Sequence, residues 1–316
     1  MKKMLLIAVL FILSTSLTAC TYWTNNKDGF DMLDSDLDES VFYEKDLSSY
    51  EQVEINIDLT VSGVKVETIG GDTLKFEQKA NREELLAAFD FSDSGDKAIL
   101  TFKNDHGIKL TAGTQNSETL IQIPDGVKVV FISNLDVGDF EMDMDDVEML
   151  EVDASTNVGK ISLSASEDQD LLNYINASSD VGDIALTFDG ALEKLEEVNM
   201  STNTGEIEAA FNGELSNELK LESKTDVGDI TLDFGGVFKE KVTCKAESSV
   251  GDINLLIPED HEVILDAHLT EFTTNLEISD IPFSKSKSIY KIDGDEALFN
   301  IDLSVSVGDA TVKYSN

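Results

Sequence analysis

The chain has 316 residues, and 41% of them are hydrophobic, which is enough to bury a core and excludes disorder over most of its length. Its formal net charge is −40, and its only arginine is Arg82. A chain with so few cations cannot neutralise a run of phosphates, so nucleic acid is excluded as a partner.

The first nineteen residues have the features of a secretory signal peptide. Lys2 and Lys3 precede an apolar run over residues 4–13, which is shorter than the ~20 residues of a membrane span. The following Leu17-Thr18-Ala19-Cys20 resembles a bacterial lipobox, which implies cleavage before Cys20 and attachment of a diacylglycerol to its thiol. We therefore expect a lipid-anchored protein on the extracytoplasmic face of the cell membrane. A plain signal peptide or an uncleaved anchor is the alternative.

Residues 20–50 are acidic and contain no regular apolar pattern, which predicts a flexible linker between the lipid and the folded part. Residues 51–135 contain alternating apolar residues without a fixed period, typical of an irregular β-rich region, either irregular β rungs or a capping β domain leading into the repeats. Within this region, the stretch "NREELLAAF" (81–89) predicts a single surface helix.

From residue 136 onward one phrase recurs, as in "SDVGDIALTF" (179–188) and "TDVGDITLDF" (225–234). Its glycines are Gly138, Gly159, Gly182, Gly205, Gly228, Gly251 and Gly308, with successive spacings of 21, 23, 23, 23, 23 and 57. A nearly constant period of this size indicates stacked repeats over residues 136–316.

Apolar residues stand two, four and six positions after each glycine, for example Ile184, Leu186 and Phe188. Alternation with period two predicts a strand with one face in the core. We expect the glycine to occupy the third position of a type II turn with positive φ, and the polar residue two positions before it to bond the backbone. The phrase is thus interpreted as a corner.

Two architectures fit a β repeat of 23 residues. In a β-solenoid, equivalent strands of successive repeats pair in parallel, whereas in an antiparallel sandwich each repeat is a hairpin. The constant length and chemistry of the columns favour the solenoid. Residues 258–304 interrupt the period and predict an extended rung or a hairpin insertion.

Acidic residues follow most of the glycines. In a solenoid, Asp183, Glu206, Asp229 and Asp252 would stack at rung spacing, where like charges repel, and a divalent cation bound between rungs would relieve that repulsion. The alternative is a hydrated acidic edge without metal, and we expect no cofactor. His261 and His268 are seven residues apart and face opposite sides of a strand, so they do not form a metal pair.

Cys244 occupies a core column that other repeats fill with Val152, Ile175, Val198 and Leu221. We therefore expect a buried structural thiol. A lipid on Cys20 would leave Cys244 without an intramolecular disulfide partner.

The repeated "VGDI" strands after a lipobox, with "VGDINLLIPEDHEVILDA" (250–267) and "IDLSVSVGDATVKY" (301–314), resemble the bacterial putative-adhesin β-solenoid family and the related toast-rack domains of envelope-stress regulators. The resemblance implies an all-β solenoid and supplies no catalytic residues. We expect a non-catalytic scaffold or adhesin-like surface that binds a cell-wall polymer or a protein. An envelope-stress sensor with a membrane protein partner and a carbohydrate-active solenoid enzyme are the alternatives.

Overall fold

The structure is a computed structural model that describes residues 37–104, 115–259, 261–269, 275–278, 281, 283–286, 288–292 and 296–315. The expected signal peptide, Cys20 and the first part of the expected linker lie outside the described residues. The described residues form β-strands and one 3-10 turn, η1 (Glu83–Leu85). None of their helical structure is long and apolar enough to cross a membrane.

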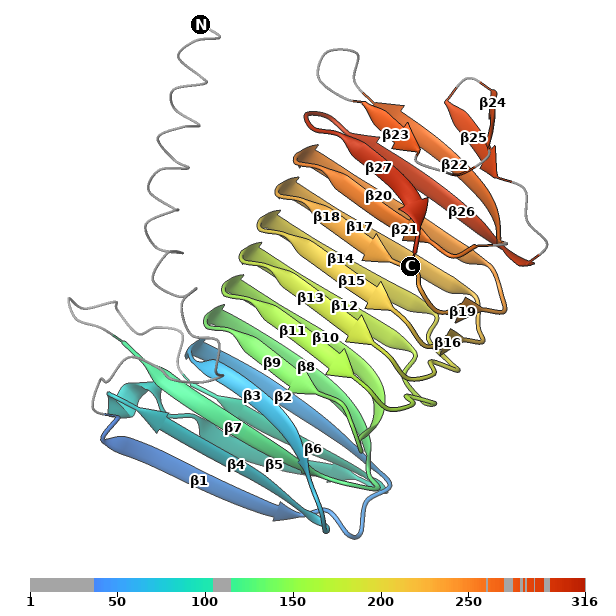
Figure 1. The fold of residues 1–316 in the computed structure, drawn as a ribbon. Coiled ribbons are helices and arrows are strands. Elements are labelled where there is room, and N and C mark those ends of the chain that lie inside the picture. Colours follow the sequence, from blue (N-terminus) through green and yellow to red (C-terminus); the bar gives the residue numbers. More distant parts are fainter. Residues whose placement is uncertain are drawn as a thin grey trace, which may run out of the picture. The chain divides into compact units, whose positions relative to one another are not determined.

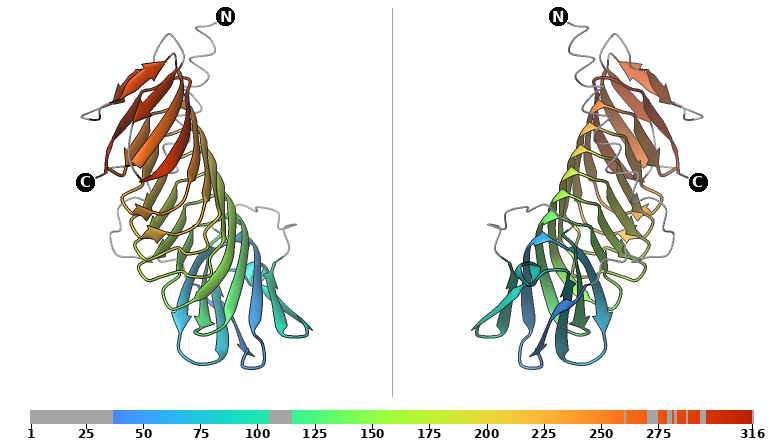
Figure 2. Two further views of the ribbon diagram at one scale, coloured as in Figure 1. Left: turned by 90° about the vertical axis from the view of Figure 1, so that its right-hand side faces the viewer. Right: turned by 90° about the vertical axis from the view of Figure 1, so that its left-hand side faces the viewer.

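Two large sheets face each other and enclose the core (Figures 1 and 2). Sheet A contains, in spatial order, β1 (Glu39–Asp46), β4 (Thr73–Ala80), β7 (Ser117–Pro124), β3 (Gly63–Ile69), β9 (Phe140–Asp143), β11 (Ile161–Ala165), β13 (Ile184–Phe188), β15 (Ile207–Phe211), β18 (Ile230–Asp233), β21 (Ile253–Ile257), β27 (Ala310–Tyr314) and β23 (Leu276–Ile278).

Sheet B contains, in spatial order, β24 (Ser284–Ser286), β25 (Ile289–Ile292), β22 (His261–Leu269), β26 (Glu296–Val305), β20 (Val242–Val250), β17 (Leu219–Val227), β14 (Glu197–Thr204), β12 (Tyr174–Val181), β10 (Glu148–Val158), β8 (Lys128–Val137), β2 (Gln52–Val61), β6 (Lys97–Lys103) and β5 (Ala88–Ser94). Two short strands, β16 (Glu214–Leu215) and β19 (Val237–Phe238), pair on the return side of the repeats.

Each rung consists of a strand in sheet B, a corner, and a strand in sheet A. Successive rungs pair in parallel and in register, so that Ile161, Ile184 and Ile207 lie opposite one another. The side chains expected to face inward at Ile184, Ile207, Ile230 and Ile253 are at most 1% exposed. The parallel pairing confirms the β-solenoid and excludes the antiparallel sandwich.

The order of the rungs in space differs from their order in the chain at both ends. The rung β2/β3 lies between β6/β7 and β8/β9, and the C-terminal rung β26/β27 lies between β20/β21 and β22/β23. Antiparallel strands continue the sheets beyond the outermost rungs: β4 and β1 beyond β7, β5 beyond β6, and β25 and β24 beyond β22. Antiparallel strands thus extend both sheets at the N-terminal end of the stack and sheet B at the C-terminal end, whereas β23, the last strand of sheet A, pairs in parallel with β27.

Three expectations for the N-terminal half need correction. The linker expected over residues 20–50 is not all linker, because β1 pairs with β4 along its whole length and Leu47 is 2% exposed. The helix expected over residues 81–89 is only η1, and β5 starts at Ala88, where an antiparallel ladder with β6 takes up the backbone. The boundary at residue 135 falls inside β8, so residues 51–135 belong to the same two sheets as the repeats.

Candidate functional site

The corner glycines are required by the close approach of successive rungs. All seven have positive φ, from 141° to 156°. These values differ from the ~80° of the expected type II turn, so that turn assignment is wrong. A Cβ on Gly182 would lie 1.9 Å from the carbonyl oxygen of Gly159, and the other six meet the preceding rung in the same way, at 1.8–2.2 Å. Only glycine fits, because the backbones stack without room for a side chain.

A row of buried hydroxyl groups fastens each corner to the rung before it. The hydroxyl of Thr202 donates a hydrogen bond to the carbonyl oxygen of Gly182 at 3.0 Å. The same bond, at 3.0–3.2 Å, is made by Thr156, Ser179, Thr225 and Ser248. The residue three positions before the glycine thus satisfies a carbonyl oxygen at the corner.

The acidic residues after the glycines also connect rungs. A carboxylate oxygen of Asp183 accepts a hydrogen bond from the backbone N–H of Glu206 at 2.9 Å, and Asp229 accepts one from Asp252 at 2.8 Å. Asp139 and Asp252 accept the corresponding bonds from Lys160 and Asp309. Each of these aspartates therefore binds the amide of the next corner.

These bonds give the row of candidate metal ligands a role in stacking. Among the described residues, no group of three or more His, Cys, Asp and Glu side chains is arranged to hold a metal ion. Repulsion does remain at Glu206, whose pKa is raised by partial burial and by the nearby charges of Asp183, Asp229 and Glu208. The row is an acidic edge whose aspartates are used in stacking.

The polar row two positions before the glycines bonds between rungs and not, as expected, to its own backbone. The side-chain amide of Asn157 donates to Asp136 at 3.1 Å, and that of Asn203 donates to Asp180 at 3.1 Å. Alternation of Asn and Asp allows this, because an amide supplies the proton that two carboxylates facing each other lack.

A second glycine row lies at the return corner, at Gly190, Gly213 and Gly236. A Cβ on Gly213 would lie 1.8 Å from the carbonyl oxygen of Gly190. The sequence of a single repeat gives no indication of this stacking, because the requirement for glycine comes from the neighbouring rung.

Cys244 lies in the core column between Leu221 and Ile301. It is 1% exposed, and burial raises the pKa of its thiol to about 12, with a smaller effect of Asp302. Neither burial nor this pKa suits a reactive thiol.

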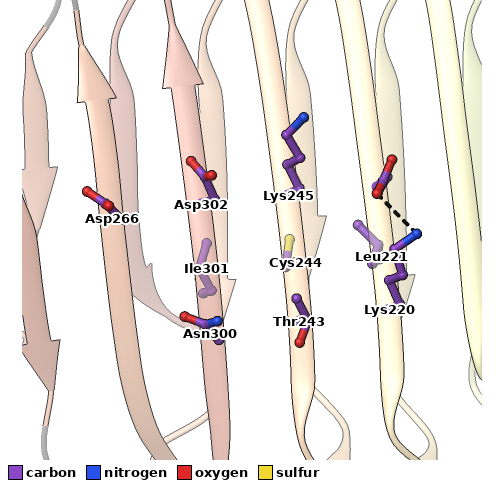
Figure 3. A pocket seen from close by; sticks show the side chains of 10 residues that line it. Lys220, Leu221, Thr243, Cys244, Lys245, Asp266, Asn300, Ile301 and Asp302 are labelled. Atoms are coloured by element: carbon purple, nitrogen blue, oxygen red, sulfur yellow. Dashed lines mark ion pairs between the residues drawn. The ribbon is translucent and has the colours of Figure 1, made fainter.

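The outer face of sheet B carries a depression of about 350 Å³ across β17, β20, β26 and β22 (Figure 3). Its polar lining is Lys220, Glu222, Thr243, Lys245, Asp266, Asn300 and Asp302, and the buried residues Leu221, Cys244 and Ile301 complete it. The lysines stand on β17 and β20, and the aspartates on β26 and β22. The chain therefore presents cations and anions side by side on adjacent strands.

Charged and polar neighbours lie close to these side chains. The ammonium of Lys220 lies 3.1 Å from Glu222 and 3.3 Å from Glu197, and these two partners raise its pKa. On the other side, Nε2 of His268 lies 3.5 Å from Asp266 and 3.7 Å from Asp302. His268 is exposed and His261 buried, as expected from opposite strand faces. The geometry suits recognition of a polar, hydrogen-bonding ligand.

Comparison with solved structures finds similar chains with little sequence identity. A putative cell adhesion protein from Clostridium sporogenes is 12% identical, with a TM-score of 0.38, over 88% of this chain and 99% of the other. A putative adhesin from Bacteroides fragilis is 12% identical, with a TM-score of 0.38, over 87% and 97%. A putative adhesin from Parabacteroides merdae is 13% identical, with a TM-score of 0.40, over 88% and 97%.

No curated protein matches the sequence. Residues 34–187 match the family described as the N-terminal domain of toast_rack, DUF2154. This range runs from just before β1 into β13, so it includes the antiparallel strands at one end and the first rungs of the stack. Over residues 34–187, just under half of the chain, the protein is therefore similar to the N-terminal domain of toast_rack.

Proposed function

We propose that this protein is a non-catalytic, lipid-anchored protein of the cell envelope, and that the outer face of sheet B binds a cell-wall polymer. The lipobox-like sequence ending at Cys20 supports the anchor. The recurring polar residues of the corner phrase are used in rung-to-rung bonds, so we assign the wall polymer to side chains outside the phrase.

One observation carries the choice of surface. Outward side chains of sheet B form straight columns because the strands pair in register, and one column runs Asp153, Asn176, Asn199, Glu222, Lys245, Asp302 and Asp266. Neighbouring strands are about 4.8 Å apart, so donors and acceptors recur at that interval. A polymer with regularly placed hydroxyl and amide groups can bond to successive rungs at once, which multiplies weak contacts into useful affinity.

The test is co-sedimentation of the protein with purified cell-wall sacculi. The variant Asn199→Ala, Glu222→Ala, Lys245→Ala removes three neighbouring polar groups from sheet B without changing the net charge. Its matched control is Thr187→Ala, Thr231→Ala, Asn254→Ala, also neutral, on the outer face of sheet A. We expect the sheet B variant to bind at least about tenfold more weakly and the control to bind like the wild type. Equal binding by all three proteins would contradict the proposal.

The anchor has its own test. Cys20→Ser should abolish incorporation of a radiolabelled fatty acid and release the protein from the membrane fraction. Photoreactive residues at positions 199 and 245 in intact cells then report the partner. Capture of a single membrane protein in place of wall polymer would move the assignment to the envelope-stress sensor.

A further inference from the structure

A row of exposed or half-buried apolar side chains follows the glycine corners. The residue just before each corner is Val61, Val137, Val158, Val181, Thr204, Val227, Val250 or Val307, and we call this set the corner row. Val137 is 41% exposed, and Val158, Val250 and Val307 are each 46% exposed. They are among the most exposed large apolar residues of the described chain.

The corner row is continuous in space. Val158 pairs in register with Val137 and with Val181, and Thr204 pairs with Val181 and Val227. Val250 pairs with Val227, and Val307 follows, since its carbonyl oxygen accepts the N–H of Gly251. The right-hand view of Figure 2 looks onto the side on which these corners lie one above another. The result is one apolar strip, not scattered exposed residues.

Corner geometry does not require valine here. Thr204 has the same pairing as its neighbours, and its rung makes the same corner bonds, from Thr202 to Gly182 and from Glu206 to Asp183. Threonine, which has the shape of valine but carries a hydroxyl group, is therefore compatible with the corner at this position. The apolar character of the other seven positions then needs a reason other than folding.

Two acidic rows flank the strip. On one side lie Asp136, Asp180 and Asp226, alternating with Asn157 and Asn203 and followed by the uncharged Ser249 and Ser306; on the other lie Asp139, Asp183, Glu206, Asp229, Asp252 and Asp309, with Lys160 as an exception. These rows disfavour an anionic membrane surface, and they disfavour a second copy of this chain, whose net charge is also −40. They favour a cationic partner, because complementary charge steers association and fixes register.

We propose that the corner row docks a protein segment that carries an apolar stripe bordered by lysine or arginine residues. The apolar stripe packs on the valines, and the flanking cations face the two acidic rows. This surface differs from the outer face of sheet B, so the partner is additional to the wall polymer.

The probe is an 18-residue amphipathic helical peptide with a leucine stripe bordered by lysines. At 1.5 Å per residue it is about 27 Å long, which spans between five and six rung intervals of about 4.8 Å. A peptide of the same composition in scrambled order has equal charge without the stripe. Binding to the lipid-free mature protein is measured by fluorescence anisotropy at several salt concentrations.

We expect the striped peptide to bind at least about tenfold more tightly than the scrambled one. Val158→Thr, Val227→Thr, Val250→Thr should weaken that binding about tenfold, while circular dichroism shows the same fold, as Thr204 already demonstrates at this position. The reverse change Thr204→Val should strengthen it a few fold. Asp136→Asn, Asp180→Asn, Asp226→Asn, which leaves hydrogen-bonding side chains in the row, should weaken binding and reduce its salt dependence.

Equal binding of both peptides, or no effect of the Val→Thr changes, would overturn the proposal, because the attraction would then come from charge alone. Binding of the protein to vesicles of anionic lipid through the valines would overturn it in favour of a membrane. The Val→Thr and Thr204→Val variants leave the outward side chains of sheet B unchanged, so sedimentation of these variants with sacculi remains an independent result for the proposed function.

Discussion

A Cβ placed on Gly205 would lie 2.0 Å from the carbonyl oxygen of Gly182, and that oxygen already accepts a hydrogen bond from Thr202 at 3.0 Å. Two residues of the phrase therefore fit the same carbonyl oxygen. Gly205 has no side chain that would clash with it, and the hydroxyl of Thr202 donates a hydrogen bond to it. The recurring glycine and hydroxyl residues of the phrase are therefore explained by stacking, without a ligand.

Gly205→Ala should lower the free energy of unfolding by more than about 3 kcal/mol, since it combines a backbone clash with a φ of 156°. Denaturant titration followed by circular dichroism measures the loss. Alanine substitutions at three other glycines separate the effect of the backbone clash from the effect of the positive φ. Gly213→Ala introduces a clash at 1.8 Å without a positive φ, Gly71→Ala has a φ of 104° with open space, and Gly70→Ala has neither.

We expect the order of destabilisation to be Gly205→Ala first, then Gly213→Ala, then Gly71→Ala at about 1 kcal/mol, with Gly70→Ala within about 0.5 kcal/mol of wild type. If Gly71→Ala proved as costly as Gly205→Ala, backbone conformation and not close approach would explain the row.

The hydroxyl row has a separate test. Thr202→Val keeps the shape of the side chain but leaves the carbonyl oxygen of Gly182 without this donor, so it should cost about 1–2 kcal/mol. Ser223 is the matched control, because its hydroxyl is buried and has no hydrogen-bond partner in the described part of the chain. Ser223→Ala should leave stability unchanged or raise it by up to about 1 kcal/mol. A larger loss at Ser223 than at Thr202 would refute the role assigned to the row.

The raised pKa of Glu206 in the acidic edge predicts that the free energy of unfolding depends on pH. Because the pKa of Glu206 is raised in the folded protein, its charged form opposes folding above the folded pKa, and this cost disappears below the unfolded value of about 4.3. Glu206→Gln should therefore stabilise the protein by a few tenths of a kcal/mol at pH 7 and have no effect near pH 4. Thermal unfolding at both pH values measures the difference.

Glu206→Lys reproduces the residue found at Lys160, and it should stabilise more than Glu206→Gln at pH 7 and low salt. Millimolar Ca²⁺ should raise the melting temperature of wild type and Glu206→Gln by the same small amount. If Ca²⁺ stabilised the wild type alone, the carboxylate row would hold a metal ion after all.

The sequence predicted those parts of the fold that depend on a repeated local pattern. The spacing of Gly159, Gly182 and Gly205 predicted the rungs, and the alternation around Ile184 predicted which side chains are buried. The glycine spacing does not identify the rung β2/β3, because Ser62 stands where later rungs have glycine. Ser62 instead bonds the hydroxyl of Thr119 at 2.8 Å, on a strand 57 residues away in sequence.

The spatial order of the rungs at the two ends of the stack could not be predicted either, because it depends on contacts between residues that are far apart in sequence. The placement of β26/β27 inside β22/β23, and of β1 at the sheet edge, is decided by pairing between distant strands, which no local period records. The bonds from Asn203 to Asp180 and from Glu206 to Asp183 likewise belong to two rungs at once. The pattern of a single repeat predicts only that the polar residue before the glycine bonds its own backbone and that the acidic residue after it is a candidate ligand for a divalent cation.

The rate at which the Cys244 thiol is labelled measures how often sheet B opens locally around this residue. Its thiol is buried between Leu221 and Ile301, and burial raises its pKa to about 12, so at pH 8 the native protein exposes almost no thiolate.

In the Cys20→Ser background we expect labelling by a thiol reagent to be at least about a thousandfold slower than in denaturant, with a rate that follows opening of the structure. The control is Thr243→Cys combined with Cys244→Ala, which moves the thiol by one residue to the outer face and should react quickly. If Cys244 reacted as fast as this control, the rung below the depression would open readily, and the depression would be part of a mobile region and not a rigid binding surface.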